Sequence, residues 1–376
     1  MNSYSGVVTK VEPFFCLNMG TGDLREALAW IEYCNIKSGS YYADLRRSHG
    51  VEKPHNIKYW ALGNEVYGSW QIAQSSKEEY SAKAIQWAKA IKLLDPTIKL
   101  ILCGKYGMTD WDRYVLAECI EWVDYHSIHF YSASGNHFES VFCPMAVEKI
   151  IQITKELIDL ARVTKHVEKD VKIAFDEWNI WDRVGVIGEE GCEQIYTVSD
   201  MLGVASWLNI FVRHANTVEI ACIAQSVNVL SPLLTKPGDI LKQTIWWPYL
   251  YFSKYMKGTV VSVFVDCDVW NGDIPNFSHP KSMQDLKWVD ASATIDQDGY
   301  LTIAIVNKET KPQSLKISMD CQSPQSSVEK WEVFGQPTDC NSWENKTKIY
   351  PKYSISPWST NMKLKACSFT LLRMKL

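Results

Sequence analysis

Short apolar runs alternate with longer segments of helical period between residues 7 and 254. The runs are apolar throughout, which is typical of parallel strands buried on both faces. The segments between them repeat apolar residues three or four positions apart, as amphipathic helices do. The predicted strands cover residues 7–18, 57–63, 98–103, 123–131, 171–175 and 218–225. Helices are predicted from Asp23, from Ser76 to Asp95, over 111–119, over 147–161, over 193–215 and over 243–254. Asp23 with Glu26, and Ser76 with Glu79, are predicted to cap the first two. A polar connection is predicted over 37–56 and a Gly-rich loop over 184–191.

Strand and helix thus alternate six times, which indicates a parallel sheet with right-handed crossovers. A (β/α)8 barrel of the TIM type needs eight such units in about 250 residues. Residues 1–257 have that length but contain only six clear strands. We therefore expect an α/β barrel domain over 1–257 in which either two strands are hidden or the beginning of the barrel is missing.

The pattern changes from residue 258 onward. Runs such as 301–306, 315–319 and 368–372 have the length and partial alternation of short strands, and turn-forming residues separate them. No helical period is present. Residues 258–376 are predicted to form a C-terminal all-β sandwich.

Composition narrows the function classes. The 376 residues are 46% hydrophobic and 22% charged, as in an ordinary globular protein, and the net charge of -4 gives no reason to expect nucleic acid or an anionic membrane as partner. Eleven cysteines without a CxxC pair argue against a disulfide framework and a structural zinc site. No stretch has the length of a membrane span, and residues 1–10 do not resemble a signal peptide. We expect a cytoplasmic protein.

Two of the predicted strands lead into glutamates. Residues 57–63 run into Asn64 and Glu65, and residues 171–175 run into Asp176 and Glu177; aromatic residues surround both. Parallel strands of a barrel end on one rim, so the two carboxylates can face each other. A carboxylate pair hydrolyses glycosidic bonds, one as proton donor and one as nucleophile. A single Asn-Glu at a strand end is usually an exposed pair without function, but two such ends in this order favour a sugar-cleaving site.

The proton donor of such a pair requires a raised pKa, whereas the nucleophile must stay ionised. Asn64 beside Glu65 can hydrogen-bond a sugar hydroxyl, which favours Glu65 as the acid/base. Sixteen tryptophans are many for this length. Most are expected to fill the core, and those beside the glutamates are candidates for stacking on sugar rings.

Four segments together resemble the family 51 glycoside hydrolases, the α-L-arabinofuranosidases. These segments are 12–22 (EPFFCLNMGTG), 60–65 (WALGNE), 176–181 (DEWNIW) and 224–229 (AQSVNV). The resemblance covers almost the whole chain and implies a retaining enzyme with a (β/α)8 barrel and a C-terminal β-sandwich. It implies that Glu65 is the acid/base on the fourth barrel strand and Glu177 the nucleophile on the seventh. The first two strands then have no counterpart here, so the barrel is expected to lack its N-terminal part.

The resemblance implies three substrate-binding residues in addition to Asn64. Tyr131 matches a tyrosine that hydrogen-bonds the nucleophile and the sugar, Trp181 matches an aromatic wall of the pocket, and Gln225 matches a glutamine that touches arabinose. It implies no cofactor, an arabinose-containing oligosaccharide or polysaccharide as partner, and a homo-oligomer, commonly a hexamer. His126 and His129 form an H-x-x-H on a strand, where they point to opposite faces, so we expect no metal site.

The leading hypothesis is a retaining exo-acting α-L-arabinofuranosidase acting on arabinan, arabinoxylan or their oligosaccharides. A related β-xylosidase or endoglucanase activity is the first alternative, because the shared barrel and carboxylate pair do not determine the sugar. A catalytically silent carbohydrate-binding fragment is the second, because the first strands are missing.

Overall fold

The structure is a computed structural model, and it describes residues 11–133, 135–182, 192–274, 282–320, 324 and 327–376. The chain forms two compact units, each built from several segments. The first unit contains Met1–His129, Ile150–Asp176 and Thr217–Ile220, and the second contains Phe130–Lys149, Glu177–Asn216 and Ala221–Leu376.

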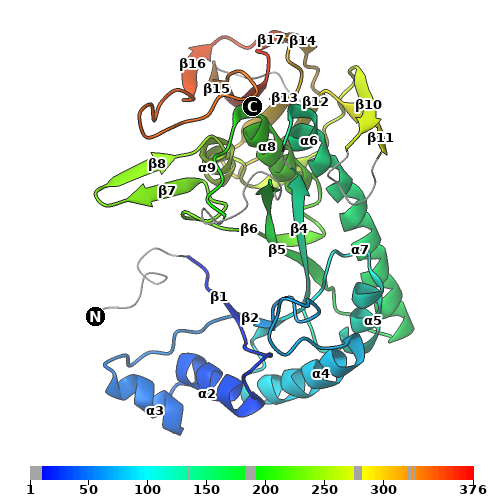
Figure 1. Ribbon diagram of the computed structural model, residues 1–376, viewed down its shortest axis with the longest axis vertical. Coiled ribbons are helices and arrows are strands. Elements are labelled where there is room, and N and C mark those ends of the chain that lie inside the picture. The colour runs from blue at the N-terminus through cyan, green and yellow to red at the C-terminus, as the bar shows by residue number, and fades with distance from the viewer. Residues whose placement is uncertain (1–10, 134, 183–191, 275–281, 321–323, 325–326) are drawn as a thin grey trace. The chain divides into compact units, whose positions relative to one another are not determined.

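A six-stranded sheet begins in the first unit, and its last three strands continue into the second unit (Figure 1). Its strands follow one another in sequence order, and the first three neighbouring pairs are parallel. Buried Ala61, Ile101, Tyr125 and Ala174 form a core between them. The strands are β1 (Phe14–Cys16), β2 (Tyr59–Leu62), β3 (Lys99–Leu102), β4 (Tyr125–Ala133), β5 (Lys172–Trp181) and β6 (Val218–Ile223). The six predicted strands are confirmed, although β1 is shorter than the predicted range 7–18, of which residues 7–10 lie outside the described residues.

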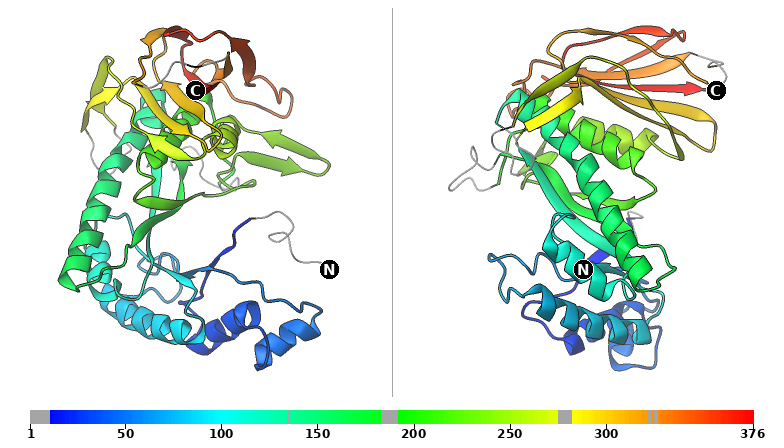
Figure 2. Two further views of the ribbon diagram at one scale, coloured as in Figure 1. Left: turned by 180° about the vertical axis from the view of Figure 1, so that it is seen from behind. Right: turned by 90° about the vertical axis from the view of Figure 1, so that its right-hand side faces the viewer.

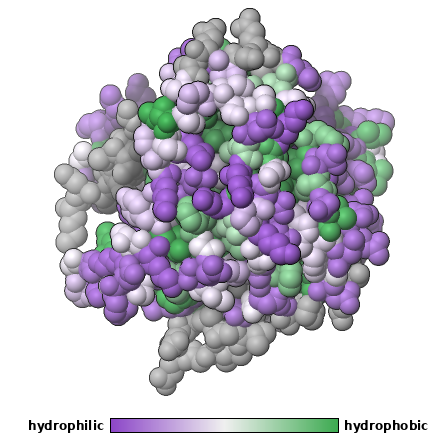
Figure 3. Space-filling view, turned by 90° about the horizontal axis from the view of Figure 1, so that it is seen from above, coloured by the Kyte–Doolittle hydropathy of each residue, from purple (hydrophilic) through white to green (hydrophobic). Residues whose placement is uncertain are grey.

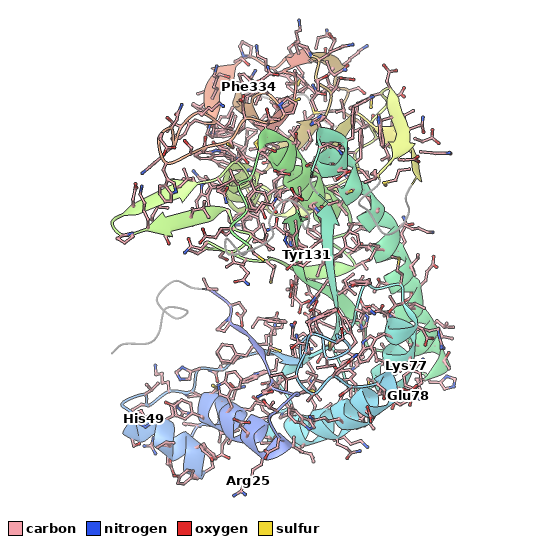
Figure 4. The ribbon with its side chains drawn as sticks, viewed as in Figure 1. Arg25, His49, Lys77, Glu78, Tyr131 and Phe334 are labelled. Atoms are coloured by element: carbon pink, nitrogen blue, oxygen red, sulfur yellow. The ribbon has the colours of Figure 1, made fainter. Side chains whose placement is uncertain are left out.

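Helices connect these strands as the helical period predicted. They are α2 (Leu24–Asn35), α4 (Lys77–Leu94), α5 (Asp110–Cys119) and α7 (Ala146–Thr164). Side-chain caps begin two of them as expected. Asp23 accepts from the Glu26 amide, and Ser76 and Glu79 form a complete capping box. Lys77 and Glu78, which Figure 4 labels, lie between the two residues of this box.

The predicted polar connection over residues 37–56 was wrong in one respect, because it contains helix α3 (Tyr41–Ser48). The residue that anchors this helix is charged, so the hydropathy pattern does not mark it as buried. Arg46 is fully buried, and its guanidinium donates to the carbonyls of Tyr33, Ile36 and Lys37. These bonds satisfy backbone acceptors near the C-terminus of α2 that burial would otherwise leave unpaired.

A buried ion pair holds α5 against β4 in the first unit. Asp112 Oδ1 lies 3.0 Å from His126 Nε2, and both side chains are fully buried. Asp112 also accepts from the Lys105 and Thr109 amides. Burial raises the pKa of Asp112, but the hydrogen bond and charge of His126 outweigh it and leave that pKa below its ordinary value.

Replacing Asp112 with alanine is therefore expected to lower the free energy of unfolding by roughly 3–5 kcal/mol, since it leaves a buried histidine without its partner. Because the pKa of Asp112 is lowered, its contribution is present at neutral pH and lost as the pH falls through that folded-state pKa. Urea unfolding at several pH values measures both effects. Asp110→Ala, which removes an exposed carboxylate of the same helix, is the control. Equal free energies of unfolding for the two variants would contradict a stabilising contact between Asp112 and His126.

The second unit contains an antiparallel sheet in the order β16-β15-β18-β13-β12-β9. Its strands are β9 (Thr259–Val261), β12 (Val289–Ile295), β13 (Tyr300–Asn307), β15 (Val328–Phe334), β16 (Lys352–Ser356) and β18 (Ser368–Lys375). Two-stranded ribbons accompany it, namely β7 (Leu233–Lys236) with β8 (Asp239–Lys242), β10 (Val269–Asp273) with β11 (Ser282–Lys287), and β14 (Gln313–Lys316) with β17 (Asn361–Leu364). The predicted β-rich C-terminal region is confirmed.

The main sheet of the second unit is covered on both faces. Ala291 and Ala293 of β12 belong to an apolar core that includes Leu364 of β17, so the β14–β17 ribbon covers one face. Asp290 and Ser292 alternate with these alanines along β12 and therefore point to the other face. There they form hydrogen bonds with Asn209 of helix α8 (Val198–Arg213). Figure 2 shows this sheet with the green helices α8 and α9 (Trp246–Tyr255) below it. The short helices α6 (His137–Phe142) and η1 (Cys143–Met145) complete the unit.

Several predictions for the second unit need adjustment. Helix α8 begins at Val198, not near residue 193, because Thr197 and Asp200 form its capping box. The β7–β8 ribbon was not predicted, and the predicted loop over 184–191 lies outside the described residues. The boundary between residues 257 and 258 stays a prediction. It falls between the end of α9 and the start of β9, although the second unit includes residues on both sides of it.

The surface gives two further observations. Polar residues cover most of the face shown in Figure 3, where apolar residues form small groups. Among the described residues, no helix combines the length and the apolar character needed to cross a membrane. The ten cysteines in the described part of the chain are free thiols.

Candidate active site

Glu65 lies in the turn that follows β2. Gly63 and Glu65 both have positive φ values, 81° and 47°. A Cβ atom at position 63 would lie 3.0 Å from Val66 Cγ1, so the close approach and the left-handed backbone both favour glycine there. A left-handed glutamate is uncommon and costs conformational energy, which is typical of residues that a functional site holds in a fixed direction. Asn64 is exposed between them.

Three side chains bind the Glu65 carboxylate within the first unit. Trp70 Nε1 donates to Oε2 over 2.8 Å, Tyr67 donates its hydroxyl to Oε1 over 3.3 Å, and His129 Nδ1 lies 2.9 Å from Oε1. The sequence reasoning missed all three partners of this carboxylate. Tyr67 and Trp70 are close to Glu65 in sequence, but their direction depends on the conformation of the turn.

These contacts determine the protonation state of Glu65. Burial raises the pKa of the carboxyl, but the hydrogen bond and charge of His129 and the bonds from Trp70 and Tyr67 outweigh burial. The pKa of Glu65 therefore lies below its ordinary value. This finding corrects the expectation of a raised pKa for the acid/base, because the surroundings of Glu65 in the first unit stabilise its ionised form.

His129 links Glu65 to a second carboxylate. Its Nε2 lies 3.4 Å from Asp176 Oδ1, and Ser127 donates to the same oxygen over 2.6 Å. The imidazole is nearly buried, so its orientation is held from both ring nitrogens. The expectation that His126 and His129 point to opposite faces is confirmed, since His126 pairs with Asp112. His129 was considered only as a metal ligand, and its contact with Glu65 was not predicted.

Glu177 belongs to the second unit and has its own aromatic surroundings. Tyr131, on β4 (Figure 4), donates its hydroxyl to Glu177 Oε1 over 2.6 Å, as the resemblance predicted. The Trp181 ring packs edge-on against the Tyr131 ring at a centroid distance of 5.4 Å. The predicted end of this strand was too early, because β5 continues through Glu177 to Trp181. Gln225 lies just beyond β6, where it is exposed and its backbone N–H donates to the Leu230 carbonyl.

The structure thus places the predicted residues in two groups. Glu65 lies with His129 and Asp176 in the first unit, and Glu177 lies with Tyr131 and Trp181 in the second. Two strands contribute residues to both groups. Strand β5 carries Asp176 of the first group and Glu177 of the second, and β4 carries His129 of the first and Tyr131 of the second. Asn64 and Gln225 are exposed at strand ends, and their contacts with a sugar stay predictions.

Comparison with protein families gives two matches. The family described as "Alpha-L-arabinofuranosidase C-terminal domain" matches residues 176–369, and "Alpha-L-arabinofuranosidase 1 domain" matches residues 19–142. The first match covers more than half of the chain. Glu177 lies in the first matched region and Glu65 in the second.

Individual proteins give the same result. "Probable alpha-L-arabinofuranosidase C" of Aspergillus fumigatus is 46% identical over 97% of this chain and 74% of its own length. "Intracellular exo-alpha-(1->5)-L-arabinofuranosidase" of Halalkalibacterium halodurans is 36% identical over 82% of this chain and 63% of its own length. Among solved structures, an arabinose complex of the α-L-arabinofuranosidase from Thermotoga maritima has a TM-score of 0.89 and 30% identity, covering 97% of this chain and 76% of that one.

Proposed function

The chain belongs to the α-L-arabinofuranosidases of glycoside hydrolase family 51 and is a glycosidase, and from this premise we propose that it removes terminal α-L-arabinofuranosyl units from glycans with retention of configuration. The observation that carries the proposal is that side-chain partners hold two carboxylates, Glu65 in the turn after β2 and Glu177 on β5. The substrates proposed are arabinan, arabinoxylan and arabino-oligosaccharides. The exo-(1→5) activity named for the H. halodurans relative favours arabinan among them.

Glu177 is proposed as the nucleophile. It attacks the anomeric carbon to form a glycosyl ester while Glu65 gives its proton to the leaving oxygen, and water then hydrolyses the ester with Glu65 as base. Tyr131 supports this role because its hydroxyl orients the attacking carboxylate. Asn64 and Gln225 are proposed to bind the hydroxyls of arabinose, and Trp181 to form a wall beside Tyr131.

The low pKa of Glu65 fits the second of its two tasks. As the general base, Glu65 must be ionised, and His129, Trp70 and Tyr67 favour that form. As the acid, Glu65 must carry a proton. An ionised nucleophile nearby would favour this protonated form, because two like charges repel each other. Formation of the ester removes the charge of Glu177, and the pKa of Glu65 falls when the base is needed. The two carboxyl groups are therefore expected to lie about 5–5.5 Å apart in a crystal structure.

Substrate comparison tests the proposal. The purified chain should hydrolyse an aryl α-L-arabinofuranoside far faster than an aryl β-D-xyloside, and NMR should show α-arabinofuranose as the first product. Faster cleavage of the xyloside would overturn the sugar assignment, and β-arabinofuranose as first product would overturn retention. The cytoplasmic location and the hexamer stay predictions, and light scattering of the purified chain tests the latter.

Tyr131→Phe is expected to lower kcat roughly 10- to 100-fold, since a hydrogen bond to a charged group contributes about 1.5–3 kcal/mol. The ring and its contact with Trp181 remain, so the change isolates the hydroxyl bond to Glu177. Steady-state kinetics on an aryl arabinofuranoside measures the loss. Tyr42→Phe, on helix α3, is the matched control; a loss of the same size in both variants would contradict the assignment.

A further inference from the structure

Trp70 is an exposed aromatic residue that several contacts nevertheless hold in place. Its side chain is 62% exposed, and its Nε1 donates to Glu65 Oε2 over 2.8 Å. The Tyr67 ring contacts it edge-on at 6.0 Å between centroids. An exposed indole normally gains little from one fixed orientation, because burial supplies most of the stabilisation of aromatic side chains. The fixed direction of Trp70 therefore calls for another explanation.

Gly68 shows how the indole lies. A Cβ atom at position 68 would be 2.4 Å from Trp70 Cε2, 2.5 Å from Cζ2 and 2.8 Å from Cδ2. An approach along the ring edge would leave Cδ2 much farther away than Cε2, so these similar distances place Gly68 against the flat face of the ring. One face of the indole rests on the backbone at Gly68, and the exposed part of the side chain is left for contact with a ligand.

The neighbouring loop adds polar and aromatic groups to the same area. Lys105 Nζ lies 5.0 Å from the centre of the Tyr67 ring and 5.4 Å from the centre of the Tyr106 ring. Tyr106 is 37% exposed. The loop after β3 thus contacts the Glu65 turn through Tyr67. Aromatic faces beside hydrogen-bonding groups are the usual composition of surfaces that bind sugar rings.

We propose that Trp70 forms the binding platform for the leaving-group saccharide, the sugar unit from which arabinose is cleaved. The proposal rests on the proposed function of Glu65 as acid/base. Glu65 must come within hydrogen-bond distance of the glycosidic oxygen, so the first leaving-group sugar lies beside this carboxylate. Trp70 is bonded to the same carboxylate, and its exposed indole offers an apolar surface to the C–H face of that sugar.

The platform predicts a difference between two substrates. An arabino-oligosaccharide leaves as a sugar that can stack on Trp70, whereas methyl α-L-arabinofuranoside leaves as methanol, which is too small. Trp70→Ala should lower kcat/KM for the oligosaccharide roughly tenfold more than kcat/KM for the methyl glycoside. The extra loss should occur mainly in KM, because stacking acts in the bound substrate as well as in the transition state.

Two further variants separate the ring from its N–H group. Trp70→Phe keeps a ring but removes the bond to Glu65, so it should largely preserve the preference for the oligosaccharide. Because that bond is one of the causes that lower the pKa of Glu65, its loss should move the basic limb of the pH profile to higher pH. Gly68→Ala retains Trp70 but displaces the indole, so it should reduce the preference as Trp70→Ala does.

Tyr41→Ala is the matched control, since it removes a 74% exposed aromatic ring from α3 and should leave the substrate preference unchanged. Thermal unfolding of each variant verifies that it is folded. Equal losses on both substrates in Trp70→Ala would assign Trp70 only to positioning Glu65 and overturn the platform. A folded wild type that cleaves neither arabinofuranoside would instead overturn the proposed function, and the platform with it.

Discussion

Replacing Glu177 with alanine is expected to lower kcat roughly 10⁴- to 10⁶-fold, the range found when an enzyme loses its nucleophile. No glycosyl ester can form without this carboxylate, and water must then attack the anomeric carbon directly. Tyr131 would lose the acceptor of its 2.6 Å hydrogen bond, but its ring would stay packed against Trp181. Kinetics on an aryl arabinofuranoside, with protein purified away from any wild-type enzyme, measures the loss.

Azide distinguishes a missing nucleophile from a damaged fold. A small anion can occupy the space left by the Glu177 side chain and attack the same face of the sugar, so added azide should restore turnover and yield the β-arabinofuranosyl azide. Glu78→Ala, which removes an exposed carboxylate at the start of α4, should keep wild-type kcat and show no response to azide. Wild-type turnover by Glu177→Ala would refute the role of this residue.

Glu65→Ala is expected to show a loss that depends on the leaving group. For an arabino-oligosaccharide, whose leaving oxygen must be protonated, kcat/KM should fall about 10²- to 10⁴-fold. A dinitrophenyl leaving group departs without a proton, so its kcat/KM should change far less. Hydrolysis of the ester still lacks its base, and the glycosyl-enzyme should accumulate.

Stopped-flow kinetics with the dinitrophenyl substrate should therefore show a burst equal to the enzyme concentration, followed by slow turnover. Glu219→Gln is the control. Glu219 lies on β6 of the same sheet and accepts a hydrogen bond from the Tyr125 hydroxyl, and it has no proposed part in proton transfer. Losses of equal size on the oligosaccharide and the dinitrophenyl glycoside would contradict the acid role of Glu65.

The sequence predicted those parts of the fold that follow from local patterns. The six strands follow from apolar runs, and the caps of α2 and α4 follow from residues three positions apart. The contact of Tyr131 with Glu177 was available only through the family resemblance, because the residues lie on different strands. Helix α3 was missed because Arg46 replaces an apolar residue at its core, and its partners are backbone carbonyls that leave no pattern in the sequence.

The surroundings of Glu65 were the largest omission in the candidate site. The sequence indicates which aromatic residues are near the carboxylate, but not that the turn directs Tyr67 and Trp70 back to it. Glu65 in this turn has a positive φ of 47°, a conformation that the residue types around it do not predict. The sequence reasoning expected a raised pKa for the proton donor, whereas the partners of the Glu65 carboxylate outweigh burial and lower its pKa.

The bonds between α8 and β12 limit how this enzyme can be engineered. Asn209 and Arg213 of α8 both bind Asp290, and Ser292 donates to Asn209. The helix and the sheet are therefore joined by a network of polar contacts inside the second unit. A chimera that exchanges the C-terminal β-region for that of another glycosidase would separate these partners and leave their charges unpaired. A graft would have to transplant Asn209 and Arg213 together with the strands.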